Sequence, residues 1–188
     1  MNRIFTAAIF LFFISCNQDK QTIQQDHADT IEVSEQDSVV QTPVAAKDPI
    51  ASIRQQVEKI NTMKLEKKHF EFMCDEKMMV DYFYADGKIV KIAVDFGTLG
   101  DVYAKEGYYY DAGKLIFNYE FVEGGPACEG CIKTDEYRSY VVDDKVIKYL
   151  KNTTEASCRK CEFPLSSRQY KLLQAQTAEE MKAILCPH

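Results

Sequence analysis

Between about residues 68 and 151 the sequence alternates apolar and polar residues, and this period of two constrains the fold most. In residues 88–96 one face carries Val90, Ile92, Val94 and Phe96. In residues 115–121 a single face carries Leu115, Phe117, Tyr119 and Phe121. Alternation of this kind, rich in tyrosine, phenylalanine, valine and isoleucine, is typical of β-strands. The middle of the chain is therefore predicted to form a sheet.

Turn signals separate these runs at short intervals. Asp86-Gly87 fits a two-residue hairpin, residues 111–113 fit a three-residue loop with Gly113 in the left-handed region, and Asp143-Asp144 is a third turn. Short turns join antiparallel neighbours, so we expect an antiparallel meander of six or seven strands. Within it, the run of Tyr108 to Tyr110 must place rings on both faces, and at least one ring should face solvent or a groove.

Helical patterns flank the predicted sheet on both sides. Asp48 and Pro49 fit an N-cap and a first helical position. An apolar stripe then follows at Ile50, Ile53, Val57 and Ile60. Near the C-terminus, capping-box spacing occurs at Ser166 with Gln169 and at Thr177 with Glu180. The predicted fold class is α+β: an N-terminal helix, the meander sheet, and a C-terminal helix or helix pair that packs on the sheet beside the first helix.

The N-terminus has the pattern of an export signal. Arg3 precedes an apolar run from Ile4 to Ile14, and Ser15 then stands before Cys16. A run of this length is too short to cross a hydrocarbon core as a helix, which needs about twenty residues. Charged start, apolar run and small residue together are typical of a secretory signal peptide.

At Phe13-Ile14-Ser15-Cys16 the chain resembles bacterial lipoprotein precursors, with Phe13 in the place where leucine is commonest. The resemblance implies cleavage before Cys16 and diacylation of its sulfur, with palmitate-like chains that insert into a lipid bilayer. It therefore predicts a lipid-anchored protein of the bacterial cell envelope, with its domain in the periplasm or at the cell surface.

Composition divides the chain into three parts. Residues 1–15 are the expected signal peptide. Residues 16–48 comprise the lipidated cysteine and a tether that is rich in glutamine and aspartate and lacks aromatic residues, which favours disorder. Residues 49–188 form the expected single α+β domain. Acidic residues concentrate in the tether, so the domain is nearly balanced in charge and has no basic stripe. Binding to nucleic acid is therefore not expected.

Six cysteines remain after the anchor, and four of them form two CxxC motifs. An even number of cysteines in an exported protein favours disulfides, because that compartment is oxidising. Cys128 with Cys131 and Cys158 with Cys161 flank a predicted hairpin, which should bring the two pairs together. That arrangement would allow two disulfides to cross-link one CxxC motif to the other. Cys74 and Cys186 are left either to bridge the sheet to the C-terminal helix or to remain as free buried thiols.

Two further interpretations of the CxxC motifs stay open. Four thiolates brought together by a hairpin would suit a tetrahedral zinc ion at Cys128, Cys131, Cys158 and Cys161. A thiol-redox role is the other, although an active CxxC motif usually opens a helix and neither motif does so here. If the disulfide interpretation holds, no cofactor is expected.

Other chemistry finds little support in the sequence, and no catalytic residue is predicted. His27 lies in the tether and His188 is the last residue, while His69 stands in a predicted strand where a solvated or packed ring is the simpler interpretation. We therefore expect a non-catalytic binding or interaction module whose tyrosine-rich sheet receives an envelope protein, a peptide or a glycan. The alternative is a cysteine-dependent metal-binding or thiol-redox protein.

Overall fold

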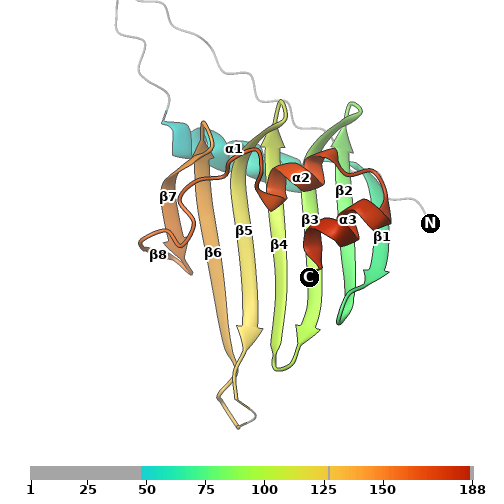
Figure 1. Cartoon of the computed structure of the whole chain (residues 1–188). Coiled ribbons are helices and arrows are strands. Elements are labelled where there is room, and N and C mark those ends of the chain that lie inside the picture. The colour runs from blue at the N-terminus through green and yellow to red at the C-terminus, as the bar shows by residue number, and fades with distance from the viewer. Residues whose placement is uncertain (1–47, 127, 187–188) are drawn as a thin grey trace, which may run out of the picture. The chain divides into compact units, whose positions relative to one another are not determined.

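The computed structural model describes residues 48–126 and 128–186. The predictions for the signal peptide, Cys16 and most of the tether lie outside these residues. The described elements, in chain order, are α1 (Pro49–Thr62), β1 (Glu66–Met73), β2 (Lys77–Ala85), β3 (Lys88–Leu99), β4 (Val102–Asp111), β5 (Lys114–Gly124), β6 (Lys133–Val142), β7 (Lys145–Lys151), β8 (Thr154–Glu155), α2 (Arg168–Gln174) and α3 (Ala178–Leu185). Figure 1 shows their arrangement.

All strands belong to one antiparallel sheet in the order of the sequence, β1 to β8. The predicted α+β class and meander are confirmed. The predicted count of six or seven strands is too low, because the sheet has eight. Its last strand is only Thr154–Glu155, which pairs with β7 after Asn152 turns the chain with a φ of 55°. Two residues are too few to produce an alternating pattern.

The hairpin turns follow their local sequence closely. At Asp86-Gly87 and at Asp143-Asp144 both residues have positive φ, which the mirror-image two-residue turns require. The loop expected at residues 111–113 is one residue shorter than predicted. Asp111 pairs with Lys114, which leaves Ala112 and Gly113 as the turn, again with positive φ.

The helices begin where their caps predict, with one exception. The Asp48 carboxylate accepts a hydrogen bond from the Ile50 amide at 2.9 Å, and Pro49 opens α1. Thr177 and Glu180 form the predicted capping box of α3. The box predicted at Ser166 is not formed: α2 starts after Ser167, whose buried hydroxyl has no hydrogen-bond partner within the described residues.

The helices lie on opposite faces of the sheet, so the predicted side-by-side packing is wrong. Figure 1 shows α1 behind the strands and α2 and α3 in front of them. Ile53 and Ile60 of α1 pack against one set of sheet residues, while Leu172 of α2 and Met181 of α3 pack against another. We name the face of the sheet under α1 the α1 face, and the face under α2 and α3 the α2 face. The central strands carry apolar residues on both faces, so each face needs a cover.

This double cover also explains the tyrosine run of β4. Tyr108 and Tyr110 lie under α2, and Tyr109 lies under α1. All three rings are buried, so the expectation that one of them faces solvent or a groove is wrong. A sheet with helices on both faces hides both sides of a strand.

Two β-bulges change which residues share a face. The register shifts between Phe83 and Tyr84 opposite Val90, and again between Tyr109 and Tyr110. As a result Val90 packs on the α1 face, away from Ile92, and Leu115 packs on the α2 face, away from Phe117. A bulge inserts one residue and so reverses the alternation, which simple counting by two cannot detect.

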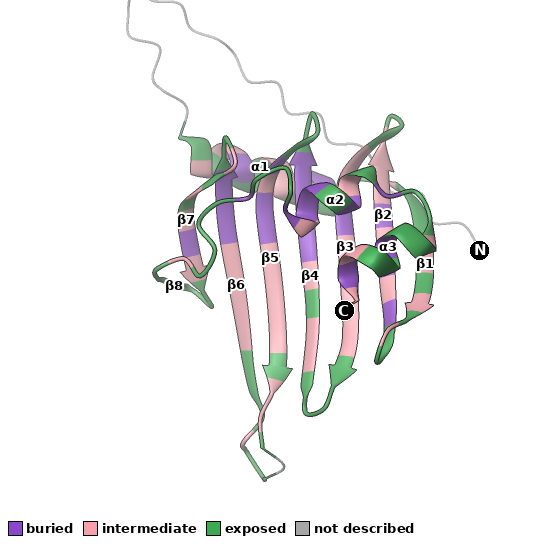
Figure 2. Cartoon of the chain, viewed as in Figure 1, coloured by how far each residue is buried: buried purple, intermediate pink, exposed green. Residues whose placement is uncertain are grey.

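The strands β3 to β6 extend beyond α1, although on the other face Phe96 still contacts Arg168 of α2. We call this part of the sheet its open end, made of residues 95–99, 102–105, 119–124 and 133–137. None of these residues is buried. Figure 2 shows buried residues along the upper halves of these strands, and intermediate and exposed residues along their lower halves.

Candidate functional site

Six cysteines of the domain pair as three disulfides. Cys74, in the turn between β1 and β2, is bonded to Cys186 at the end of α3, with their Cα atoms 5.5 Å apart. The other two bonds lie within the CxxC motifs, where the Cα–Cα distances are 5.3 Å for Cys128–Cys131 and 5.4 Å for Cys158–Cys161. Each CxxC bond therefore closes a small loop of its own.

The predicted meeting of the two CxxC motifs is wrong. Cys131 precedes β6 at the open end of the sheet. Cys161 lies at the other end, where its carbonyl accepts a hydrogen bond from Val146 near the start of β7. The hairpin of β6 and β7 does not return its ends to each other, because β7 is shorter and the chain turns back at Asn152.

This separation removes the tetrahedral thiolate site that the sequence left open. The four sulfurs of Cys128, Cys131, Cys158 and Cys161 lie in two bonded pairs at opposite ends of β6. Among residues 48–126 and 128–186, no three histidine, cysteine or acidic side chains lie close enough to hold a metal ion.

His69 stands on the exposed side of β1 in a network of charges. Its Nδ1 lies 2.6 Å from an Asp81 carboxylate oxygen, and its Nε2 lies 3.2 Å from Glu71. These hydrogen bonds, chiefly the one to Asp81, raise the pKa of His69. Lys67 and Lys77 bind the same two carboxylates. His69 is thus a member of a surface ion-pair network, and His188 lies outside the described residues.

The open end carries an aromatic patch on its α1 face, which we define as Tyr103, Tyr119 and Phe121. Tyr103 and Phe121 meet edge to face, with ring centroids 6.1 Å apart. The Lys105 ammonium lies 4.6 Å from the centre of the Phe121 ring. All three rings are only half-buried. Side chains of this kind supply large contact areas at protein interfaces.

Carboxylates fix the two tyrosines of this patch. The Tyr103 hydroxyl donates to Asp95 at 2.8 Å, and the Tyr119 hydroxyl donates to Glu136 at 2.9 Å. Burial, together with these carboxylates, raises the pKa of each tyrosine to about 12. Both phenols therefore stay neutral at physiological pH, and their rings are held in place before any partner binds.

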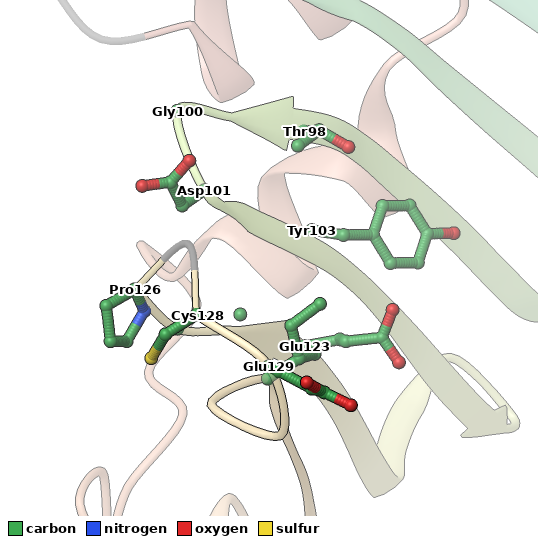
Figure 3. Close-up of a pocket in the computed structure, with 11 residues that line it drawn as sticks. Thr98, Gly100, Asp101, Tyr103, Glu123, Pro126, Cys128 and Glu129 are labelled. Atoms are coloured by element: carbon green, nitrogen blue, oxygen red, sulfur yellow. The ribbon is translucent and has the colours of Figure 1, made fainter.

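A hollow of about 550 Å³ continues from this patch to the tip of the sheet. Its lining comprises Thr98, Gly100, Asp101, Tyr103, Glu123, Gly124, Gly125, Pro126, Cys128, Glu129 and Ile132. Figure 3 shows Tyr103 and Glu123 on adjacent strands, with Asp101 and the Cys128–Glu129 loop at the edge of the hollow. The hollow thus joins two hairpin ends, the β3–β4 turn and the β5–β6 connection.

Two glycines and a disulfide shape the wall of the hollow. A Cβ atom on Gly124 would lie 2.5 Å from the carbonyl oxygen of Asp101. One on Gly125 would collide with the carbonyl of Cys131. Only glycine lets the chain pass this closely, and the Cys128–Cys131 bond fixes the loop that it passes. These close approaches and the disulfide therefore define the shape of the wall at Gly124, Gly125 and Cys131.

Negative charge dominates the hollow. Asp101, Glu123 and Glu129 line it and no basic side chain does. None of these three carboxylates forms an ion pair with another residue of the described chain; Glu123 accepts a hydrogen bond from the Thr134 hydroxyl at 3.2 Å. An exposed apolar residue, Ile132, lies at the same edge and is 67% exposed. Such a surface complements a partner that carries both cations and apolar groups.

The second CxxC loop has a different setting, on the α2 face. Between its cysteines, Arg159 stacks over the Tyr137 ring at 3.7 Å and donates to the Tyr149 hydroxyl at 3.0 Å. The same guanidinium forms a 2.5 Å ion pair with Glu120. Lys160 donates to Gln169 of α2 at 3.2 Å. Contacts from the loop therefore reach the sheet and a helix.

A partly buried charge network lies beside this loop. Glu106 and Glu120 stand opposite each other on β4 and β5, and Arg168 of α2 pairs with Glu106 at 2.5 Å. Burial raises the pKa of Glu106. Burial also lowers the pKa of Lys160, with a further contribution from the positive charge of Arg168. Three cations thus face two carboxylates in this region.

The sequence predicted that the cysteines form disulfides, but it did not predict the pairing within each CxxC motif or the open end. The run from Phe117 to Phe121 has one alternating pattern, yet Phe117 is buried under α1 and Phe121 is not. The lengths of the elements could have indicated the open end. The fourteen-residue helix α1 cannot cover the whole area of strands that are ten to twelve residues long.

Comparisons with protein-family models, with curated proteins and with solved structures found no match.

Proposed function

We propose that this protein is a lipid-anchored bacterial envelope protein whose domain binds a partner protein at the open end of its sheet. The N-terminal signal pattern and Cys16 support the anchor. Three disulfides support export, because such bonds persist in oxidising compartments. Within the described residues, no helix has the length and apolarity to cross a membrane.

The observation that carries the binding proposal is the half-buried aromatic patch joined to a hollow. Carboxylates hold the hydroxyls of Tyr103 and Tyr119, and the rings of Tyr103 and Phe121 meet edge to face. Tyr119 borders the cluster under α1, whereas Tyr103 and Phe121 lie outside it. A preformed surface needs little ordering on association, which favours affinity. The Cys128–Cys131 bond adds the same advantage at the adjoining loop.

The partner that fits this surface is a protein segment with basic and apolar side chains. Asp101, Glu123 and Glu129 supply negative charge without ion-pair partners in the described chain, and aromatic rings attract cations at their faces. A glycan would stack on the rings but would not use the carboxylates in this way. Binding should therefore weaken with increasing salt concentration.

A peptide of alternating lysine and leucine tests this chemistry, with the same peptide carrying glutamate in place of lysine as the control. Replacing both Glu123 and Glu129 by glutamine should weaken binding of the lysine peptide about fivefold, from roughly 0.5 kcal/mol per exposed ion pair. Equal binding of the two peptides, or an unchanged affinity in the variant, would overturn the assignment of a basic partner.

A matched aromatic pair tests the location. At the open end, Phe121 lies under the Lys105 ammonium. On β2, the centre of the Phe83 ring lies 5.4 Å from the ammonium of Lys91. Both rings are half-buried. Phe121→Ala should abolish cross-linking of the anchored protein to its envelope partner, whereas Phe83→Ala should leave it intact. Equal loss in both variants would count against the open end.

The anchor is tested separately by metabolic labelling. Labelled palmitate should enter the wild-type chain and not the Cys16→Ser variant, and only the wild type should fractionate with membranes. A labelled Cys16→Ser variant, or an unlabelled wild type in the soluble fraction, would contradict lipidation.

A further inference from the structure

Two disulfides of identical ring size stand in opposite electrostatic settings in this chain. Cys128 and Cys131 enclose Glu129 and Gly130, whereas Cys158 and Cys161 enclose Arg159 and Lys160. Their Cα–Cα distances, 5.3 and 5.4 Å, are nearly equal. Any difference in their reactivity therefore reflects surroundings and not loop length.

The Cys158–Cys161 loop is held in place by contacts that do not involve its sulfurs. On one side Ala156 donates its amide to Tyr149, at 3.1 Å. On the other side the Cys161 carbonyl accepts from Val146 at 2.9 Å, and Phe163 donates to Asp144 at 2.8 Å. If the bond were reduced, the two thiols would remain neighbours, ready to form the bond again.

Charge around this loop favours an additional anion. Within the described chain Arg159 pairs with Glu120 and Arg168 pairs with Glu106, whereas Lys160 contacts an amide oxygen but no carboxylate. A cation beside a cysteine stabilises the thiolate, which makes the sulfur a better leaving group in exchange. The Cys128–Cys131 loop has a carboxylate in the corresponding place.

We propose that Cys158–Cys161 is a thiol–disulfide exchange site that accepts electrons from a protein dithiol. Cys161 is the exposed member and Cys158 is half-buried, so the attack falls on the Cys161 sulfur. A substrate thiolate forms a bond to Cys161 and breaks the bond to Cys158, which leaves as a thiolate. The second substrate thiolate then attacks its partner sulfur and releases Cys161. The substrate ends as a disulfide, and its two protons are taken up by Cys158 and Cys161.

The two loops of one molecule provide the test. The full chain is equilibrated in buffers of reduced and oxidised dithiothreitol, and differential alkylation with mass spectrometry reports each pair separately. Cys158–Cys161 should be reduced at the more oxidising potential, with an equilibrium constant at least about tenfold larger, which corresponds to about 30 mV for a two-electron couple. Equal potentials, or the reverse order, would overturn the proposal.

Charge-changing variants test whether the charge beside each disulfide sets its equilibrium constant for reduction. Lys160→Gln should lower the equilibrium constant for reduction of Cys158–Cys161 and leave that of Cys128–Cys131 unchanged. Glu129→Lys should raise the constant for Cys128–Cys131, which makes this variant the matched control. No change in either variant would contradict the electrostatic cause.

A trapping experiment identifies the attacked sulfur. Cys158→Ser leaves the exposed Cys161 thiol alone, and this variant should form a stable mixed disulfide with a test peptide that contains one cysteine and is supplied as its mixed disulfide with thionitrobenzoate, which is released as the thiolate. Cys161→Ser should form much less. Equal trapping by both variants, or none by Cys158→Ser, would contradict the assigned direction of attack.

Discussion

The two ends of the same strands differ in almost every respect. Where helices cover β3 to β6, the side chains are buried on both faces, as at Tyr108 and Tyr109. At the open end no residue is buried, and the Cys128–Cys131 disulfide closes only its own loop. One end of the sheet carries the stability of the domain, which leaves the other end free to present a preformed surface.

The largest effect should come from the Cys74–Cys186 disulfide, which ties the β1–β2 turn to α3 and packs against the α2-face core. Cys74 and Cys186 are 112 residues apart, and a bond that closes a loop of this size contributes about 5 kcal/mol by restricting the unfolded chain. Replacing both cysteines by serine should lower the free energy of unfolding by up to that amount, measured by urea denaturation. A loss as small as that from the open-end disulfide would contradict the division between the ends.

The same substitution, leucine to alanine, can be made at the covered end and at the open end of the sheet. Leu172 of α2 is fully buried, whereas Leu99 at the open end is 52% exposed. Leu172→Ala should destabilise the protein by about 3 kcal/mol, because it leaves a cavity. Leu99→Ala should change the free energy of unfolding by less than about 0.5 kcal/mol. Similar losses in the two variants would show that the open end belongs to the stabilising core.

The disulfide of the open end should matter more for binding than for stability. Closing the short loop of Cys128–Cys131 contributes at most about 2 kcal/mol. Replacing both cysteines by serine should cost no more than this in urea denaturation. It should also weaken binding of the lysine–leucine peptide, because the loop beside the hollow is then no longer fixed. Unchanged binding would contradict its role in shaping the surface.

The smallest effect should be a pH dependence at His69, away from both ends. Hydrogen bonds to Asp81 and then Glu71 raise its pKa in the folded state. The protonated form is therefore favoured by folding, so the contribution is complete below pH of about 6.5 and is lost as pH rises through the raised pKa. The pair is exposed, so the change should be only a few tenths of a kcal/mol. His69→Gln should remove this slope in denaturation curves measured from pH 6 to 8.

Local signals predicted much of the fold. The Asp86-Gly87 and Asp143-Asp144 turns and the Asp48 cap act over a few residues, and each prediction is confirmed. The alternating runs do form strands, but register shifts place Val90 and Leu115 on other faces than predicted. The bulge opposite Val90 and the division of the helices between two faces depend on contacts between distant residues. Neither leaves a local pattern.

The candidate site was less predictable for the same reason. Cysteine pairing within the motifs depends on the turn at Asn152, which sends Cys161 away from Cys131. Phe121 has the sequence pattern of Phe117, and only the reach of α1 decides which ring is covered. The open end is defined by where packing stops, and this follows from the whole fold.

Tyrosine ring signals in β4 offer the most direct test that the open end binds and the covered end does not. In the full chain with isotope-labelled tyrosine, NMR spectra recorded during titration with the lysine–leucine peptide should show shifts for Tyr103 and for Tyr119 of β5. Signals of Tyr108, Tyr109 and Tyr110 should stay in place. Shifts confined to those three buried rings, or no shift at Tyr103 at saturating peptide, would contradict a binding surface at the open end.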